Sequence, residues 1–234
     1  MPFAKVEEAI AAIGRGEIVI VVDDEDRENE GDLIMAAEFA TPEAIAFFLH
    51  HPSGVICAPS TAERARELDL PLMVANNTEA MRTAFTVSVD YRHGTTTGIS
   101  AHDRAATIRA LVDPATRPSD LLRPGHIFPL AARDGGVLVR AGHTEAAVDL
   151  AHMAGLYPAG VLCELVNETK DDMARGEELE RFAEEHGLLL ISIADIVRYR
   201  RQTEKLVKRV AEARIPTRWG DFTAYAYESV LDGR

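Results

Sequence analysis

The sequence concentrates carboxylates in one short stretch, residues 23–32 (DDEDRENEGD), where seven of ten residues are acidic and one is basic. This acidic segment carries a formal charge of −6, close to half of the −13 of the whole chain. The mostly apolar residues 17–22 precede it and the apolar residues 33–37 follow it, so we expect both of its ends to be anchored in the core. Like charges that are held close together raise one another's pKa or require a cation. The segment therefore predicts a bound metal, a cationic partner or carboxylates that transfer protons.

The spacing within the acidic segment excludes a calcium-binding EF-hand. Counted from Asp26, positions 1, 3, 5 and 6 carry suitable residues, but position 12 is Ala37 where the EF-hand needs Glu, and the flanks are apolar strands. A Mg²⁺ or Mn²⁺ site built from one or two carboxylates and substrate oxygens fits better. Arg27 either pairs with a neighbouring carboxylate or reaches an anionic substrate. The alternative without a ligand is a solvated acidic hairpin tip.

A second group of residues able to bind an anion or a metal, 140–144 (RAGHT), lies just before an expected helix. Gly142 and Thr144 suit a turn into the helix N-cap, and the free N–H groups there, with Arg140 beside them, make an anion site that suits a phosphate. His143 is either a metal ligand or an ordinary residue of the capping region. Another Thr-Gly turn at residues 95–98 (TTTG) is a second candidate phosphate cradle.

Glu164 is the only charge in the apolar run 160–166 (GVLCELV), where an ionised side chain is costly. A bulge, an edge position or a buried ion pair would account for it. Proton transfer would account for it equally, because burial raises the pKa of a carboxyl toward the working pH. His126 is either a histidine at the edge of the core or a general acid or base. Cys57 and Cys163 form neither a CxxC pair nor a disulfide framework, and we expect both as small core residues.

The elements that must position these residues alternate between helices and mostly apolar strands. This alternation predicts an α/β domain in which helices cover both faces of the sheet, a layered α-β-α arrangement with a mixed sheet. Thr41 is expected as a helix N-cap with Pro42 after it, and Ser100 with Asp103 resembles a capping box. We expect helices at 6–13, 42–50, 61–68, 101–112, 144–154, 177–186 and 196–213, strands at 17–22, 54–58, 85–90, 127–130, 137–139, 160–166, 188–193 and 223–227, and a loop at 113–125.

Composition narrows the class of protein further. The chain is 47% hydrophobic and 27% charged, which is typical of a globular protein. Its acidic balance argues against general nucleic-acid binding, which needs a basic face. No apolar run approaches the ~20 residues of a membrane span, and the N-terminus lacks the apolar centre of a signal peptide. We therefore expect a cytoplasmic protein that binds neither nucleic acid nor membrane.

Four segments, taken in order, resemble the 3,4-dihydroxy-2-butanone 4-phosphate synthases of riboflavin biosynthesis. They are residues 23–32, residues 123–126 (RPGH), residues 142–146 (GHTEA) and residues 160–164 (GVLCE). The resemblance implies a lyase that converts ribulose 5-phosphate to 3,4-dihydroxy-2-butanone 4-phosphate and formate with Mg²⁺ or Mn²⁺. It also implies a homodimer with sites at the interface, in which His143 could come from the partner chain.

The resemblance also implies roles for individual residues. Glu28 and His143 match the metal ligands, and His126 and Glu164 match the residues regarded as essential for catalysis. Arg140 and Thr144 would hold the phosphate, with Thr97. The substrate-binding positions match Arg27, Glu28, Asp32, Arg140, Ala141, Gly142, His143, Thr144 and Glu164. The pocket wall would include Asp23, Glu30 and Cys57.

The end of the chain carries a second resemblance. Residues 209–217 (RVAEARIPT), continuing to Tyr227, resemble the linker and first strand of GTP cyclohydrolase II, but its zinc-binding cysteine motif is absent from this sequence. We therefore expect residues 1–200 to form the synthase domain. Residues 201–234 should form a linker helix and the start of a cyclohydrolase-like domain, without cyclohydrolase activity.

Two other functions use the same residues. A metal-dependent sugar-phosphate isomerase or aldolase would keep all five carbons or split them into three and two. An acidic module that binds cations or partners would not need Glu164. Formate release distinguishes the synthase from both.

Overall fold

The computed structural model describes residues 3–231 of the chain. Its helices are α1 Val6–Gly14, α2 Pro42–His50, α3 Ala62–Glu67, α4 Ala101–Val112, α5 His143–Met153, α6 Glu177–His186 and α7 Ile193–Thr203, with short 3-10 turns at Ala37–Phe39, Pro118–Asp120 and Gly136–Leu138. Its strands are β1 Val19–Val22, β2 Gly31–Ala36, β3 Cys57–Thr61, β4 Val89–Tyr91, β5 Leu121–Ala132, β6 Gly160–Glu164, β7 Leu189–Ser192, β8 Val207–Thr217 and β9 Gly220–Ser229.

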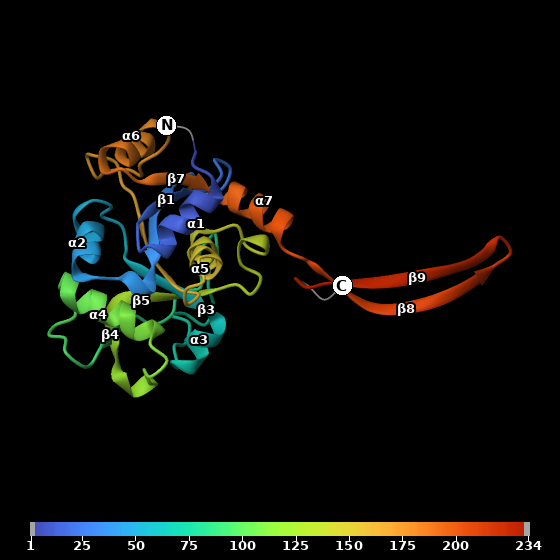
Figure 1. The fold of residues 1–234 in the computed structure, drawn as a ribbon. Helices are drawn as coiled ribbons and strands as arrows, with labels where there is room; N and C mark the ends of the chain where they lie inside the picture. Colours follow the sequence, from blue (N-terminus) through green and yellow to red (C-terminus); the bar gives the residue numbers. More distant parts are fainter. Residues whose placement is uncertain (1–2, 232–234) are drawn as a thin grey trace.

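Seven strands form one mixed sheet in the order β4-β5-β3-β6-β2-β1-β7 (Figure 1). The β1–β7 and β3–β5 pairs are parallel, whereas β1–β2, β2–β6, β3–β6 and β4–β5 are antiparallel. The mixed α/β architecture expected from the sequence is therefore confirmed.

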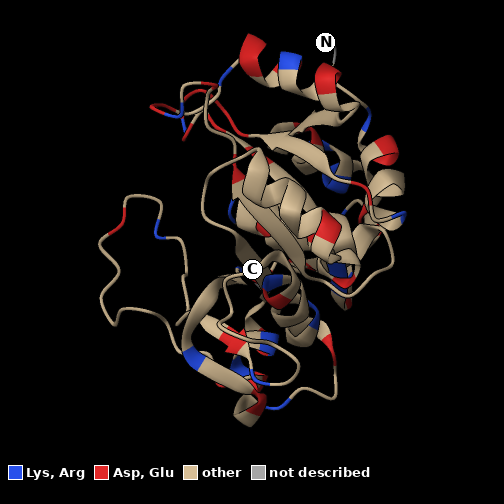
Figure 2. Ribbon diagram, turned by 90° about the vertical axis from the view of Figure 1, so that its left-hand side faces the viewer, with Lys and Arg blue, Asp and Glu red and all other residues tan. Residues whose placement is uncertain are grey.

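Both faces of the sheet are buried, which explains why its strands are almost wholly apolar. Successive side chains of a strand point to opposite faces. In β1, Ile20 packs into one core with Phe48 of α2 and Ile108 of α4, while Val21 packs into a second core with Ile13 of α1. In Figure 2 the central strands carry almost no charge colour, and the acidic and basic segments lie on surrounding helices and loops. Among the described residues, no helix is both long and apolar enough to cross a bilayer.

Local capping signals were reliable guides to where helices begin and end. The Thr41 hydroxyl accepts a hydrogen bond from the Ala44 N–H at the start of α2, and Gly187 ends α6 in the left-handed region at φ 64°. Ser100 likewise accepts from the Asp103 N–H. The reciprocal half of the expected capping box is wrong, however, because the Asp103 carboxylate turns back to the Thr96 and Gly98 N–H groups instead.

Four expectations about strands and loops were wrong. The expected strand 137–139 is a 3-10 turn, entered through Gly135 and Gly136 at positive φ. The expected loop 113–125 ends early, since β5 begins at residue 121 and tolerates Pro124 in a stretch that is unpaired with β4. Strand 85–90 contracts to β4, and strand 54–58 moves about three residues along the chain to β3.

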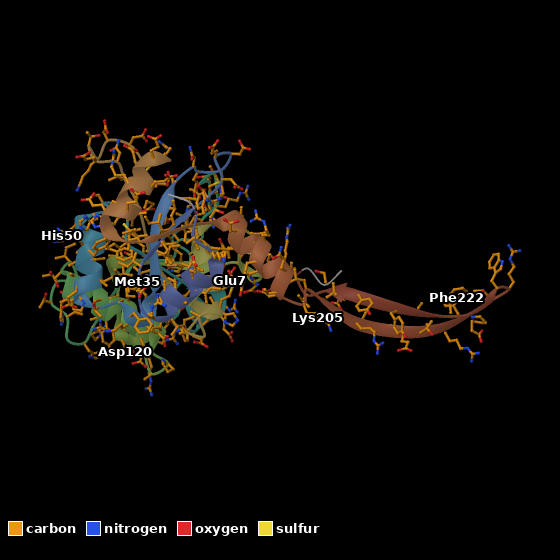
Figure 3. All side chains as sticks on the ribbon, turned by 45° about the horizontal axis from the view of Figure 1, so that its top comes forward. Glu7, Met35, His50, Asp120, Lys205 and Phe222 are labelled. Carbon is orange, nitrogen blue, oxygen red and sulfur yellow. The ribbon has the colours of Figure 1, made fainter. Side chains whose placement is uncertain are left out.

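The expected helix 196–213 was also wrong in its second half. Helix α7 ends at Thr203, and residues 207–217 form β8, which pairs with β9 along its whole length. Pairing with a following strand overrides helix propensity here. The resulting hairpin projects from the body (Figure 1), and Phe222 lies far out along it while Met35 lies at the centre of the body (Figure 3).

Removing the hairpin is expected to leave the stability of the body unchanged. Every residue of β8 is exposed, whereas α7 buries Ile193 and Ile196 to 2% and 0% exposure. A chain that ends at Glu204 should therefore keep its Tm in a calorimetric scan. As the matched control, a chain that ends at Ser192 should lose roughly 10 °C or more, because two large apolar side chains lose their burial. A fall in Tm on removal of the hairpin alone would show that it stabilises the body.

Candidate active site

The acidic segment is the connection between β1 and β2, whose last pair is Val22 with Gly31. Its first carboxylate, Asp23, has a side chain only 1% exposed and holds the connection together. The Glu30 N–H donates to its Oδ1 at 2.9 Å, and the Glu28 N–H and Arg27 Nη1 donate to its Oδ2 at 3.0 Å and 2.7 Å. The negative charge of Asp23 is thus offset by three hydrogen-bond donors of the same loop. Asp24, Glu25 and Asp26 at the tip are exposed.

Glu28 and His143, far apart in the sequence, meet in this structure. His143 is the first residue of α5 and is 6% exposed. Its Nδ1 lies 3.7 Å from Glu28 Oε2 and 3.9 Å from Asp32 Oδ2. One ligand atom each of Asp23, Glu28 and His143 lies within 4.8 Å of the others. His143 of the same chain fills this position, so the possibility that the partner chain supplies it is wrong for this arrangement.

Burial and neighbouring charges shift the pKa values of Glu28, His143 and Asp32. Interaction with His143 lowers the pKa of Glu28 to about 2, a shift that burial opposes and the Arg27 charge reinforces. Burial opposes the charged form of His143, but Asp32, Glu28 and Asp23 together raise its pKa to about 9. Burial raises the pKa of Asp32 to about 7, although His143 opposes the shift. At neutral pH the metal-free cluster therefore holds an imidazolium against ionised Glu28, with Asp32 partly protonated.

The residues present fit a small divalent cation. Two buried polar atoms, Asp32 Oδ1 and His143 Nε2, have no hydrogen-bond partner among the described residues. Such atoms are costly unless something satisfies them. Carboxylate oxygens with one imidazole suit Mg²⁺ or Mn²⁺, and a cation would replace the proton that His143 now carries.

The cluster opens into a cavity of about 170 Å³. Asp32 of β2 and Glu164 of β6 are paired in register at its floor. Glu164 is only half-buried, at the end of its strand, and its Oε2 accepts a hydrogen bond from the Val55 N–H at 2.8 Å. The lining comprises Arg27, Glu28, Glu30, Asp32, Cys57, Glu79, Thr83, Phe85, Leu130, Arg140, His143, Thr144, Leu162 and Glu164.

The helix terminus that carries His143 also suits an anion. Gly142 is the N-cap of α5 and provides no side-chain acceptor, so the first N–H groups of the helix stay free. Thr144, in the first turn, lines the cavity beside Arg140. Arg140 is held in place from two sides, since it donates to Glu145 Oε2 at 2.6 Å and to Thr83 Oγ1 at 2.9 Å. Ala141 is exposed and does not line the cavity.

Five of the expected site residues do not line this cavity: Asp23, Thr97, His126, Ala141 and Gly142. His126 lies in β5 and contacts Asp90 of β4, and Thr97 is exposed in the turn before α4. Cys57 pairs with both Phe128 and Leu162. Because side chains alternate along a strand, His126 and Glu164, each two residues from these partners, project from the same face near the same end of the sheet.

Sequence reasoning missed Glu79 and Thr83, which reach the cavity from the irregular segment 71–83. Glu79 shapes that segment by accepting hydrogen bonds from the Met81 and Thr83 N–H groups. No motif or periodicity marks these residues. A larger cavity of about 270 Å³ lies beside Phe182 and His186 of α6, but it contains none of the expected site residues.

Raising the pH from 7 to 9 in a chelator is expected to destabilise the protein through His143. The pKa of His143 rises from 6.5 to about 9 on folding. Its stabilising charge is therefore fully present below pH 6.5 and is lost as the pH rises through about 9. By pH 9 the free energy of unfolding should fall by about 2 kcal/mol, measured by urea denaturation. His143→Gln lacks the titrating group, so an equal pH dependence in both proteins would contradict this assignment.

Comparison with known proteins identifies the family of this chain. The family model of 3,4-dihydroxy-2-butanone 4-phosphate synthase matches residues 7–199. Over 232 residues the chain is 60% identical to the riboflavin biosynthesis protein RibBA of Nocardia farcinica, covering 98% of this chain and 56% of that protein. It is 57% identical to the bifunctional riboflavin biosynthesis protein RIBA 1, chloroplastic, of Arabidopsis thaliana, covering 99% of this chain and 43% of that one. The chain thus spans about half the length of these curated relatives.

Solved structures show the same fold. RibBX, a two-domain 3,4-dihydroxy-2-butanone 4-phosphate synthase from A. baumannii, superposes with a TM-score of 0.88 at 47% identity, covering 98% of this chain and 67% of that one. A 3,4-dihydroxy-2-butanone 4-phosphate synthase in complex with two magnesium ions superposes with a TM-score of 0.83 at 48% identity, covering 86% and 98% of the two chains. The chain therefore belongs to the 3,4-dihydroxy-2-butanone 4-phosphate synthase family.

Proposed function

We propose that this chain converts ribulose 5-phosphate to 3,4-dihydroxy-2-butanone 4-phosphate and formate, a lyase step of riboflavin biosynthesis. The observation that carries the proposal is the cavity itself. It joins a cation-binding cluster, Glu28 with His143, to an anion-binding helix terminus with Arg140 and Thr144. A sugar phosphate carries the two groups that such a cavity would hold, a phosphate and polarisable oxygens.

The phosphate is assigned to the N-terminus of α5. The free N–H groups of that helix and the Arg140 guanidinium provide charge-assisted donors. The Thr144 hydroxyl adds a further donor on the cavity wall. Because Glu145 and Thr83 already orient Arg140, little side-chain entropy is lost when the phosphate binds. Arg27, between Asp23 and Glu28, is placed to reach an oxygen of the sugar chain.

The metal is assigned to Glu28 and His143, with Asp23 as a third possible ligand within reach. When bound, Mg²⁺ or Mn²⁺ would polarise the substrate carbonyl and lower the cost of the charge that develops on its oxygen. Asp23 already accepts three hydrogen bonds, so it has little capacity left and its main work is to hold the loop. This leaves Glu28 and His143 as the principal pair.

Proton transfer is assigned to Glu164 and His126. The route through enolisation, loss of the C1 hydroxyl, skeletal rearrangement and hydrolysis needs groups that take and return protons. Glu164 lies on the cavity floor beside Asp32. Glu30 and Cys57 complete the wall.

Release of formate from ribulose 5-phosphate in the presence of Mg²⁺ tests this function directly. Glu28→Gln and Glu164→Gln are each expected to lower kcat by at least about 100-fold, because a metal ligand and a proton carrier are lost. Glu25→Gln is the matched control, since it removes an exposed carboxylate from the same loop, and it should keep full activity. Products that retain all five carbons, or a split into three and two carbons seen by carbon NMR, would contradict the proposal.

We also propose that the active unit is a homodimer with shared sites. His126 and Thr97 lie outside the cavity lining of their own chain, which supports a role for them in completing the cavity of a second copy. The two-fold symmetry of a dimer would repeat this exchange at both sites.

Mixed dimers test the shared site. Co-expressed, doubly tagged dimers of one His126→Ala chain and one Glu164→Gln chain should recover about half of the wild-type rate, because one of the two sites then holds both intact residues. Each variant homodimer should keep at most about 1% of the wild-type rate. If His126 acts within its own chain, every site in the mixed dimer lacks one residue, and no activity would return. Light scattering on the wild type checks the dimer itself.

The segment beyond α7 is assigned to a different unit. Several curated relatives of about twice this length are called bifunctional. In this chain the β8–β9 hairpin stands apart from the body (Figure 1). We propose that residues 201–234 comprise a linker and the start of a cyclohydrolase-like domain.

A further inference from the structure

We propose that Asp90 is a positioning residue that holds the His126 imidazole with its proton on Nδ1, so that Nε2 is the nitrogen presented to substrate. The inference rests on the proposed role of His126 in proton transfer. No motif in the sequence singles out Asp90, and it lies outside the cluster around Glu28 and His143.

The backbone around His126 needs such a support. In the ladder between β4 and β5, Val89 pairs with Ile127 while Asp90 pairs with Leu122. Residues 123–126 therefore lie between these two pairs with no ladder partner in β4, and the strand bulges there. His126 is the last residue of this bulge, and its side chain is 40% exposed. A partly exposed imidazole on an irregular backbone would sample several rotamers unless a neighbour fixed it.

Asp90 provides that fixation with both of its carboxylate oxygens. It is 7% exposed. Its Oδ1 accepts the His126 backbone N–H at 2.9 Å, and its Oδ2 lies 2.8 Å from His126 Nδ1. One carboxylate thus holds the residue at its main chain and at its ring.

The chemistry of these contacts decides which ring nitrogen carries the proton. An ionised carboxylate only accepts hydrogen bonds, so Nδ1 must be the donor. Nε2 makes no hydrogen bond to any residue in the described range and is left to accept or return a proton. When Nε2 takes a proton, the Asp90 charge also stabilises the imidazolium that forms, as the aspartate does in a Ser-His-Asp triad.

The turn that contains Gly98 packs closely against the Asp90 carboxylate. A Cβ at Gly98, where φ is +89°, would come within 2.1 Å of Asp90 Oδ2, so only glycine allows this close approach. Asp103, 2% exposed, anchors the turn by accepting from the Thr96 and Gly98 N–H groups at 3.1 Å and 3.0 Å.

One charged group from a neighbouring helix lies near Asp90. Arg104 of α4 lies near enough for the Asp90 charge to oppose the effect of burial on the pKa of its guanidinium. A second Asp–His pair in the chain shows the contrast. His93 Nε2 lies 3.1 Å from Asp120 Oδ1, but the His93 side chain is 57% exposed and Asp120 makes no second contact with it. That pair is a surface contact, which makes Asp120→Asn a matched control.

Asp90→Asn is the informative change because asparagine has one oxygen. If that oxygen keeps the His126 backbone N–H, the NH₂ group faces Nδ1 and donates to it. The ring proton then moves to Nε2, the nitrogen that should accept. We expect kcat for formate release to fall by about 10²–10⁴-fold, with KM changed less than about threefold. Asp120→Asn should leave both constants unchanged.

Nitrogen-15 NMR of the histidine rings tests the proposal without relying on activity. In the wild-type protein the His126 signals should show a proton on Nδ1, and in Asp90→Asn they should show it on Nε2. In a His126→Gln background, Asp90→Asn should cause no further loss of kcat, because its effect passes through that ring.

A proton on Nε2 in the wild type, or full kcat in a folded Asp90→Asn protein, would overturn the inference. The wild-type spectrum decides the tautomer even if Asp90→Asn does not fold. If the wild type released no formate, the proposed function would fail while the ring assignment could still be read from the spectrum.

Discussion

Repulsion among the carboxylates of the β1–β2 connection is the constraint on which the site depends. Seven acidic residues in ten cannot be brought together without compensation. The carboxylates of this connection have three different surroundings. Asp23 turns inward and is offset by Arg27 and two backbone N–H groups, Glu28 faces the His143 imidazolium, and the acidic residues at the tip stay in water. The compensating charge on His143 is a proton in the metal-free protein, and a cation would take its place.

The sheet makes this compensation possible because it brings segments that are distant in the sequence together at the ends of neighbouring strands. β2 lies between β1 and β6, so Asp32 stands beside Glu164 at the ends of their strands. Helix α5 packs against the sheet, and its N-terminus, with His143 and Thr144, lies next to these two carboxylates. A helix N-terminus disfavours a nearby cation and favours an anion. The carboxylates around His143 therefore favour a cation, and the free N–H groups of the same helix terminus favour an anion beside it.

Buried carboxylates recur as structural supports in this protein. Asp23 holds the acidic loop, Asp103 holds the turn before α4, Glu145 holds Arg140, and Asp90 holds His126. Each accepts from at least two donors, which offsets the cost of burying an ionised group. The residues assigned to chemistry are thus oriented by a second set of acidic residues with different burial and different partners. The strongly acidic composition serves both sets.

The sequence by itself determined the layered fold, most helix boundaries and the groups able to do chemistry. Apolar strands, the Thr41 cap and the Gly187 stop are local signals, because they depend on side chains within a few residues of one another. The acidic segment and the residues before α5 also carried enough chemical information to predict a metal and a phosphate. Only the tertiary structure decided that Glu28 meets His143 in one chain, that Glu79 and Thr83 reach the cavity, that Asp90 holds His126, and that residues 207–217 form a strand. The first three depend on contacts between segments distant along the chain, and the strand depends on pairing with the segment that follows it. Neither residue type nor periodicity records which segments will meet.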